Sequence, residues 1–161
     1  MSRQLEPEAS RMERRARVMK AVNRPMRVLL SLPFPTPLSS RLMLVRVVGR
    51  KTGRVYRQPV SFVRDGDTLL TPGGGRWKGN LANGQAVTLR LRGRSVQARP
   101  DLVRDPDEVH QLVGRMVAAN RRLASFIPFV ERDGTINMEQ LETALRYGFC
   151  VVRWRLESGI R

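Results

Sequence analysis

The chain has 161 residues, 41% of them apolar, and its 30 Lys and Arg outweigh 14 Asp and Glu to give a formal net charge of +16. This length suits one domain with one core, and no apolar run approaches the roughly 20 residues that span a bilayer. The single cysteine, Cys150, excludes an internal disulfide and favours a reducing cytoplasm. The positive charge indicates an anionic partner, which could be nucleic acid, a membrane surface or a polyanionic small molecule.

The N-terminal part of the chain is predicted to be a basic helix followed by an extended connector. Apolar residues at spacings of three and four, flanked by arginines, indicate an amphipathic helix over residues 8–31. Pro25 should kink or end this helix. The prolines of residues 32–38 favour an extended segment. Within a single domain of residues 1–161, we therefore expect residues 1–38 to precede a core formed by residues 39–157.

The middle of the chain and its C-terminus are predicted to form short antiparallel strands. Branched and apolar runs joined by small turns indicate about six strands, over residues 41–48, 55–63, 68–71, 86–91, 95–103 and 149–156. Pro59 marks an edge strand or a bulge, and Asp65-Gly66 is typical of a hairpin turn. This pattern favours a compact antiparallel barrel or sandwich.

Two helices are predicted between the last two strands, which makes the fold class α+β. Asp105 can cap the first helix, Pro106 suits its first position and Glu108 completes a capping box. This helix is expected to extend to about Ser125. Asn137 is expected to cap the second helix, with its inward face formed by Met138, Leu141 and Leu145.

The sequence offers no evident nucleophile or metal site. The only histidine, His110, lies in a predicted helix, and Cys150 lies in an apolar strand where a thiol is normally inert packing. No Cys/His cluster suggests a zinc site, and the glycines around residue 50 lack the spacing of a P-loop. If the protein is an enzyme, its reactive group is therefore expected to come from a cofactor.

The segment Val48-Gly49-Arg50-Lys51-Thr52-Gly53-Arg54 is the first candidate binding motif. Its glycines allow a turn in which backbone N–H groups converge on one point. Its three cationic side chains can surround that point. A phosphate is the natural guest, because charge-assisted hydrogen bonds are about twice as strong as neutral ones. The alternative is a solvated basic hairpin.

The segment from Pro72 to Leu81 (PGGGRWKGNL) is the second candidate motif. If a helical turn begins near Arg76, Trp77 and Asn80 lie on one face of it. Tryptophan offers a flat surface and a donor, and asparagine offers both a donor and an acceptor. The alternative is a flexible loop followed by a tryptophan of the core.

Together these motifs resemble the deazaflavin-dependent nitroreductases and quinone reductases. The resemblance covers residues 42–103 and lies in the order GRKTGR, QPVSFV, RDGD, a glycine-rich loop and W-x-x-N-L. It implies a split β-barrel related to flavin-binding proteins. It also implies binding of coenzyme F-420, an 8-hydroxy-5-deazaflavin with a phosphate and an oligoglutamate tail. The expected reaction is hydride transfer from the reduced coenzyme to a quinone, a nitroaromatic or a similar small acceptor, so no residue of the chain is assigned a catalytic role.

The resemblance also implies roles for particular residues. The expected cofactor-binding residues are Arg50, Lys51, Arg54, Pro59, Val60, Ser61, Arg76, Trp77 and Asn80. Pro59 and its neighbours would lie with their backbone along the deazaflavin ring. An apolar substrate pocket is expected from Phe126, Phe129 and Tyr147. The chain departs from the family in its short loop before Trp77, and in Tyr56 at a position where an arginine is usual.

Other functions remain open at this stage. A split barrel of this kind also suits flavin mononucleotide (FMN) or another planar ligand. Binding of nucleic acid is disfavoured, because aromatic residues are only 6% of the chain and are not interleaved with the basic ones. Residues 8–31 suit association with a membrane surface, which is compatible with a lipid-soluble acceptor. The sequence is compatible with a monomer or a homodimer.

Overall fold

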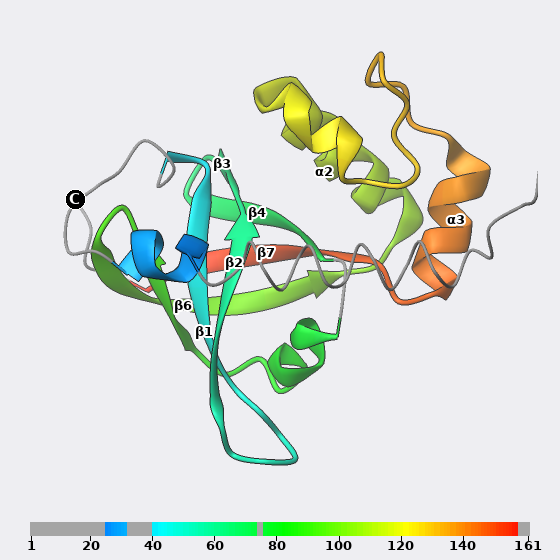
Figure 1. The fold of residues 1–161 in the computed structure, drawn as a ribbon. Helices are drawn as coiled ribbons and strands as arrows, with labels where there is room; N and C mark the ends of the chain where they lie inside the picture. Colours follow the sequence, from blue (N-terminus) through cyan, green and yellow to red (C-terminus); the bar gives the residue numbers. More distant parts are fainter. Residues whose placement is uncertain (1–24, 32–39, 74–75, 158–161) are drawn as a thin grey trace, which may run out of the picture.

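A computed structural model of the protein describes residues 25–31, 40–73 and 76–157 (Figure 1). Residues 25–31 are helical. The remainder of the predicted basic helix, and the connector over residues 32–38, lie outside the described residues. None of the described helices is both long and apolar enough to cross a bilayer.

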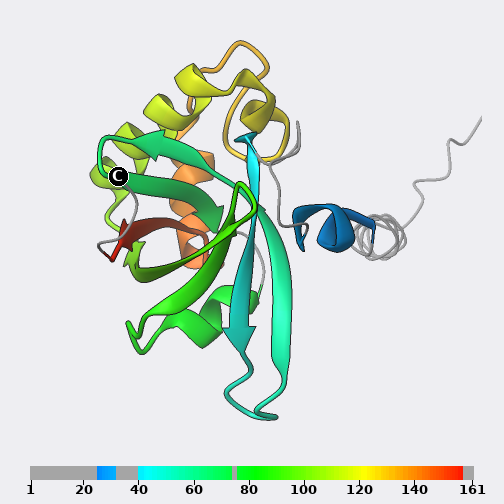
Figure 2. The same cartoon turned by 90° about the vertical axis from the view of Figure 1, so that its left-hand side faces the viewer.

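Seven antiparallel strands form one curled sheet, with the order β2-β1-β5-β6-β7-β4-β3. The strands are β1 (Leu42–Val48), β2 (Val55–Ser61), β3 (Val63–Asp65), β4 (Thr68–Gly73), β5 (Val87–Leu91), β6 (Arg94–Val103) and β7 (Cys150–Leu156). Although β2 and β3 are consecutive in the chain, they lie at opposite ends of the strand order. The sheet must therefore curl, and Figures 1 and 2 show a half-barrel. The expected α+β split barrel is confirmed.

The structure has seven strands rather than about six because the run over residues 55–63 is divided. Ser61 is the last residue of β2 to pair with β1. The N–H of Phe62 then donates to the carbonyl of Arg41 at 3.0 Å. Val63 instead pairs with Leu70 of β4, so the division at Phe62 carries the chain from one end of the sheet to the other.

Two apolar cores lie on the two faces of the sheet. Inside the half-barrel, alternate residues of β1 (Met43, Val45 and Val47) pack with Leu89 and Trp154. On the outer face, Val103 and Val151 pack against the helices α2 (Pro106–Ala119) and α3 (Met138–Arg146). The alternation of inward and outward residues along each strand therefore decides which side chains face the barrel interior.

The caps of the two helices are formed largely as predicted. Asp105 accepts a hydrogen bond from the N–H of Glu108, and Asn137 accepts one from Gln140. The first helix ends at Ala119 rather than near Ser125, because Asn120 is extended and caps a separate 3-10 helix, η3 (Arg121–Ser125).

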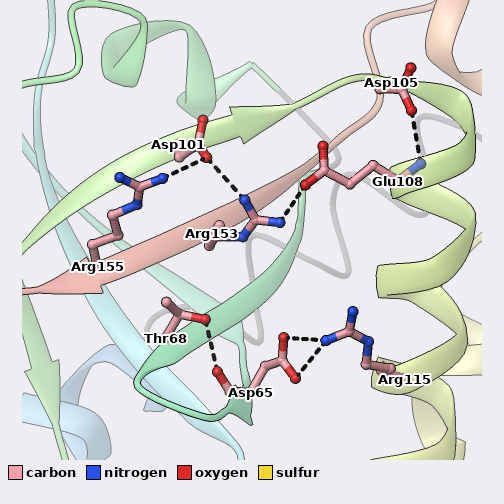
Figure 3. Close-up of polar contacts among 8 residues, drawn as sticks. All are labelled: Asp65, Thr68, Asp101, Asp105, Glu108, Arg115, Arg153 and Arg155. Carbon is pink, nitrogen blue, oxygen red and sulfur yellow. Dashed lines mark hydrogen bonds and ion pairs between the residues drawn. The ribbon is translucent and has the colours of Figure 1, made fainter.

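Two details of the predicted helices are wrong. Met138 was expected to face inward, but it is exposed, whereas Leu141 is fully buried. The carboxylate of Glu108 does not close a capping box. It receives a hydrogen bond from Arg153 of β7 at 2.6 Å, which ties α2 to the sheet (Figure 3).

Candidate functional site

The turn between β1 and β2 is a closed loop at the tip of a long hairpin (Figure 2). The N–H of Gly49 donates to the carbonyl of Arg54 at 2.8 Å, and the N–H of Gly53 donates to the carbonyl of Gly49 at 2.9 Å. Gly53 has a φ of 66°, which favours glycine. Gly49 is needed for a different reason, because a β-carbon there would lie 2.9 Å from Cε2 of Tyr56.

These hydrogen bonds correct one expectation about the turn. We expected its backbone N–H groups to converge on an anion. Instead, the N–H groups of Gly49, Gly53 and Arg54 are used within the turn, and that of Arg50 bonds to Asn80. The turn therefore presents to a ligand its cationic side chains and at most the N–H groups of Lys51 and Thr52.

The W-x-x-N motif forms the 3-10 helix η2 (Trp77–Leu81), which begins after Arg76 as predicted. It lies beside the hairpin in both views of the fold (Figures 1 and 2). Asn80 joins the two elements. Its Oδ1 accepts from the N–H of Arg50 at 3.1 Å, and its Nδ2 donates to the carbonyl of Trp77 at 3.3 Å.

Trp77 is oriented by a second tryptophan. Its ring stacks on Trp154 of β7, with centroids 6.4 Å apart and an interplanar angle of 10°. Trp154 is fully buried and donates from Nε1 to Oγ1 of Thr71 at 3.0 Å. The buried indole therefore sets the plane of the half-buried one. Sequence reasoning missed Trp154, because it lies far from the motif in the chain. It also missed Thr71, which directly precedes the motif, because its role depends on that distant indole.

The turn and η2 enclose a cleft of about 530 Å³. Its walls combine cations with apolar and amide groups. They are formed by Arg27, Val47, Gly49, Arg50, Lys51, Thr52, Tyr56, Gln58, Arg76, Trp77, Gly79 and Asn80. Four of these described residues are cationic and none is acidic, so the cleft suits an anionic ligand. A flat indole and an aliphatic side chain beside the cations suit a ligand that is also planar.

Five of the nine predicted cofactor-binding residues line this cleft, namely Arg50, Lys51, Arg76, Trp77 and Asn80. The side chains of Arg54, Pro59, Val60 and Ser61 do not. Val60 packs in the barrel core. However, β2 is at the end of the strand order, and alternate backbone groups of an end strand point away from its sheet. The backbone of Pro59 to Ser61 therefore stays a candidate contact.

The three aromatic residues expected to form a substrate pocket lie in different environments. Phe129 is fully buried in the core, where its ring meets that of Phe149 edge-on at 5.0 Å. Phe126 is exposed, and Tyr147 is exposed beside a different cavity on α3. None of the three lines the cleft beside Trp77.

Sequence reasoning missed several residues that line the cleft. Tyr56 and Gln58 precede Val60 on the same face of β2, so the period of two along this strand could have identified them. Arg27 comes from the helix over residues 25–31. No local pattern predicts its contribution, because it depends on how that helix crosses the hairpin.

Lys78 of η2 and Cys150 of β7 are close enough to influence each other's ionisation. Lys78 donates from Nζ to the carbonyl of Gly73 at 2.5 Å. Burial lowers the pKa of Lys78, and burial raises the pKa of the Cys150 thiol, although Lys78 and Arg104 partly oppose the latter shift. Neither residue lines the cleft. Within the described part of the chain, no cluster of His, Cys, Asp and Glu could hold a metal ion.

Of three similar solved structures, one aligns with a TM-score above 0.5 and supports the fold. A protein of unknown function from Agrobacterium tumefaciens aligns with a TM-score of 0.53 and 15% identity, over 82% of this chain and 53% of that one. An F420 reductase aligns with a TM-score of 0.43 and 18% identity, over 81% and 92% of the two chains. The heme storage protein HutZ from Vibrio cholerae aligns with a TM-score of 0.48 and 15% identity, over 74% and 83%.

A comparison with curated proteins gives no significant match. The family model described as F420H(2)-dependent quinone reductase matches residues 15–139, which are most of the chain. The match includes both motifs and every strand except β7. The chain therefore belongs to the F420H(2)-dependent quinone reductase family.

Proposed function

We propose that the protein is a deazaflavin-dependent reductase that uses coenzyme F-420 to reduce a quinone, a nitroaromatic or a similar small acceptor. The proposal rests on family membership and on one structural observation. The two motifs that carry the resemblance line a single cleft and are joined by the hydrogen bond between Arg50 and Asn80, which are 30 residues apart in the chain. The four cations and the flat indole in that cleft match a phosphorylated, planar ligand.

The cations at the hairpin tip are proposed to hold the phosphate of the coenzyme. Arg50 is exposed, and its Nη2 lies 3.8 Å from the position that a β-carbon on Gly79 would take. The guanidinium therefore lies over η2, beside Gly79. Arg50 can donate in a bidentate manner, and Lys51 adds a flexible point charge. Arg54 lies outside the cleft wall, where it can add only a longer-range attraction.

The ring of the coenzyme is proposed to lie against Trp77, whose plane Trp154 fixes. The open edge of β2, at Pro59 to Ser61, then offers backbone groups to the polar edge of the ring. Gln58 lines the cleft and donates to the carbonyl of Pro59 at 3.3 Å. Its side-chain oxygen can still accept a hydrogen bond. The residues of the cleft thus fit a ring that has one apolar face and one polar edge.

When bound, the reduced coenzyme supplies the hydride. The residues of the chain bind and orient. Arg50 and Lys51 anchor one end, Asn80 locks the turn to η2, and Trp77 covers apolar surface and excludes water from it. Fixing two reactants relative to one another can lower a barrier by about 7–11 kcal/mol, so positioning alone is a sufficient role for these groups.

A lipid-soluble acceptor would be reached most easily at a membrane surface, and we propose that the N-terminal helix provides that contact. In the described helix, Val28 and Leu29 are exposed beside Arg27, which lines the cleft. Exposed apolar residues next to a cation suit an interfacial helix. Val28→Gln/Leu29→Gln should weaken co-sedimentation with anionic liposomes. Equal co-sedimentation of this variant and the unaltered chain would contradict the membrane contact.

Coenzyme F-420 binding tests the reductase proposal. Tryptophan fluorescence is followed while the coenzyme is titrated into the unaltered chain, Arg50→Ala/Lys51→Ala and the control Arg121→Ala/Arg122→Ala. The control removes two exposed neighbouring arginines of η3, outside the cleft. Hydrogen bonds to charged groups contribute about 1.5–3 kcal/mol each, so loss of two should weaken binding by the first variant at least about 100-fold.

The same titration with FMN tests the alternative cofactor. We expect FMN to bind more weakly than coenzyme F-420. Tighter binding of FMN would favour the flavin alternative. If the unaltered chain does not bind coenzyme F-420, or if the two double variants bind it equally well, the assignment of the cleft is refuted.

A further inference from the structure

The outer face of the sheet, which points away from the Trp154 core, has two halves with different charge pairing. On the β6–β7 half, Arg99 lies directly opposite Arg155, but the arginines there are paired with carboxylates. Arg99 pairs with Glu157 at 2.7 Å, and Arg153 contacts both Asp101 and Glu108 (Figure 3). Arg155 also reaches Asp101, at 3.7 Å. This half of the face is therefore neutralised within the fold.

The β1–β2–β5 half carries three arginines on the same face, without such neutralisation. Arg46 of β1 lies directly opposite Arg57 of β2, and it lies opposite Thr88 of β5 on its other side. Arg90 of β5 lies opposite Leu44, which is two residues before Arg46 along β1. Among the described residues, no carboxylate forms an ion pair with any of the three arginines.

The three arginines border a cavity of about 420 Å³, together with Ser31, Leu44, Thr88 and Ser95. Arg90 is held in place, since Nη1 donates to Oγ of Ser95 at 3.0 Å and Nη2 donates to the carbonyl of Ser31 at 3.5 Å. Leu44 is buried. The cavity is thus a concave site lined mainly by cationic and hydroxyl groups, with one preorganised guanidinium.

Placing Arg46 opposite Arg57 opposes folding, because like charges directly opposite on adjacent strands repel. We propose that Arg46, Arg57 and Arg90 form a second anion-binding site, which takes a phosphate group. Three guanidiniums supply more paired donors than one carboxylate can accept, whereas a phosphate offers several oxygens to bidentate arginines. The hydroxyls of Thr88 and Ser95 can add further donors.

This site is separate from the cofactor cleft and does not depend on the proposed function. Side chains alternate along β1 and β2. Val47 and Tyr56 line the cleft, while their neighbours Arg46 and Arg57 line the outer cavity. The cofactor cleft and the outer cavity therefore lie on opposite faces of the β1–β2 hairpin.

Pyrophosphate is a suitable probe, followed by isothermal titration at low ionic strength. Arg50→Gln/Lys51→Gln serves as the parent chain, so that binding in the cleft is suppressed. Adding Arg46→Gln/Arg57→Gln should weaken pyrophosphate binding at least about tenfold. Adding Arg121→Gln/Arg122→Gln, which removes the same charge from η3, should leave the affinity unchanged. Arg46→Lys/Arg57→Lys keeps the charge and should recover part of the affinity.

Vesicles distinguish a soluble phosphate from a lipid headgroup. The same variants are sedimented with phosphatidylcholine vesicles that contain phosphatidate. A selective loss with Arg46→Gln/Arg57→Gln in either assay supports the site, and the assay that detects it identifies the source of the phosphate. Thermal unfolding without ligand should show that this variant is at least as stable as its parent, because a repulsion is removed. If this variant and the η3 control bind both probes equally, the proposal is overturned.

Discussion

The backbone N–H of Arg50 donates to the side-chain oxygen of Asn80 at 3.1 Å across 30 residues of sequence. The same side chain donates to the carbonyl of Trp77. One amide therefore fixes the cationic turn and the indole relative to one another. This bond joins the hairpin tip to η2 directly, in addition to the packing of Leu81 in the barrel core.

Asn80→Ala should lower both stability and coenzyme affinity. Loss of a hydrogen bond of this kind costs about 0.5–1.5 kcal/mol of unfolding free energy, measured by urea denaturation. Asn83→Ala is the matched control, because Asn83 also accepts a backbone hydrogen bond at 3.1 Å, from Gln85. The control should be destabilised similarly but should bind coenzyme F-420 normally. Equal affinity in the two variants would remove Asn80 from the site.

Thr71→Val should destabilise the protein through Trp154. Valine has a similar shape but cannot accept the hydrogen bond from the fully buried indole Nε1. An unsatisfied buried donor costs about 1–3 kcal/mol. Thr88→Val is the control. It removes the hydroxyl that accepts a hydrogen bond from Gln97 at the surface, where water can take the place of the lost acceptor. If urea denaturation shows the same loss of unfolding free energy for both variants, the hydrogen bond from Trp154 to Thr71 contributes no more to stability than the one from Gln97 to Thr88.

Gly49→Ala should destabilise the turn by steric conflict, and removal of one neighbour should relieve it. A β-carbon would meet Tyr56 at 2.9 Å, and such overpacking costs about 1–3 kcal/mol. Gly49→Ala/Tyr56→Ala should therefore cost less than the sum of the single changes. At Gly53 the cost is backbone strain at positive φ with open space around it, so Tyr56→Ala should not rescue Gly53→Ala.

The buried thiol should make stability fall at alkaline pH. Burial raises the pKa of Cys150 above the ordinary value of 9.0. As pH rises, the thiol therefore loses its proton first in the unfolded chain. The contribution of the thiol to the free energy of unfolding is full below about pH 9 and is lost as pH rises through the pKa of the folded state. The difference in unfolding free energy between the unaltered chain and Cys150→Ala should be constant at neutral pH and shrink above pH 9. If the unfolding free energies of the unaltered chain and Cys150→Ala have the same pH dependence, the thiol has the same pKa in the folded and unfolded chain.

Local patterns predicted most elements well. The strand over residues 41–48, the caps Asp105 and Asn137 and the helical turn after Arg76 all depend on residues a few positions apart. Errors arose where distant contacts decided the outcome. The strand beginning at Val55 is divided because its second part pairs with β4, and Glu108 binds Arg153 rather than its own helix terminus.

The sequence by itself determined the chemistry of the cleft, namely glycines that permit the turn, cations at its tip and an indole with an amide three residues later. Those features are local, and they sufficed to indicate the family. Only the tertiary structure decided that the two motifs meet, that Trp154 orients Trp77, and that Arg46 and Arg57 share a face without a carboxylate among the described residues. Such relationships depend on how the sheet curls and which strands become neighbours, and no short-range pattern encodes them.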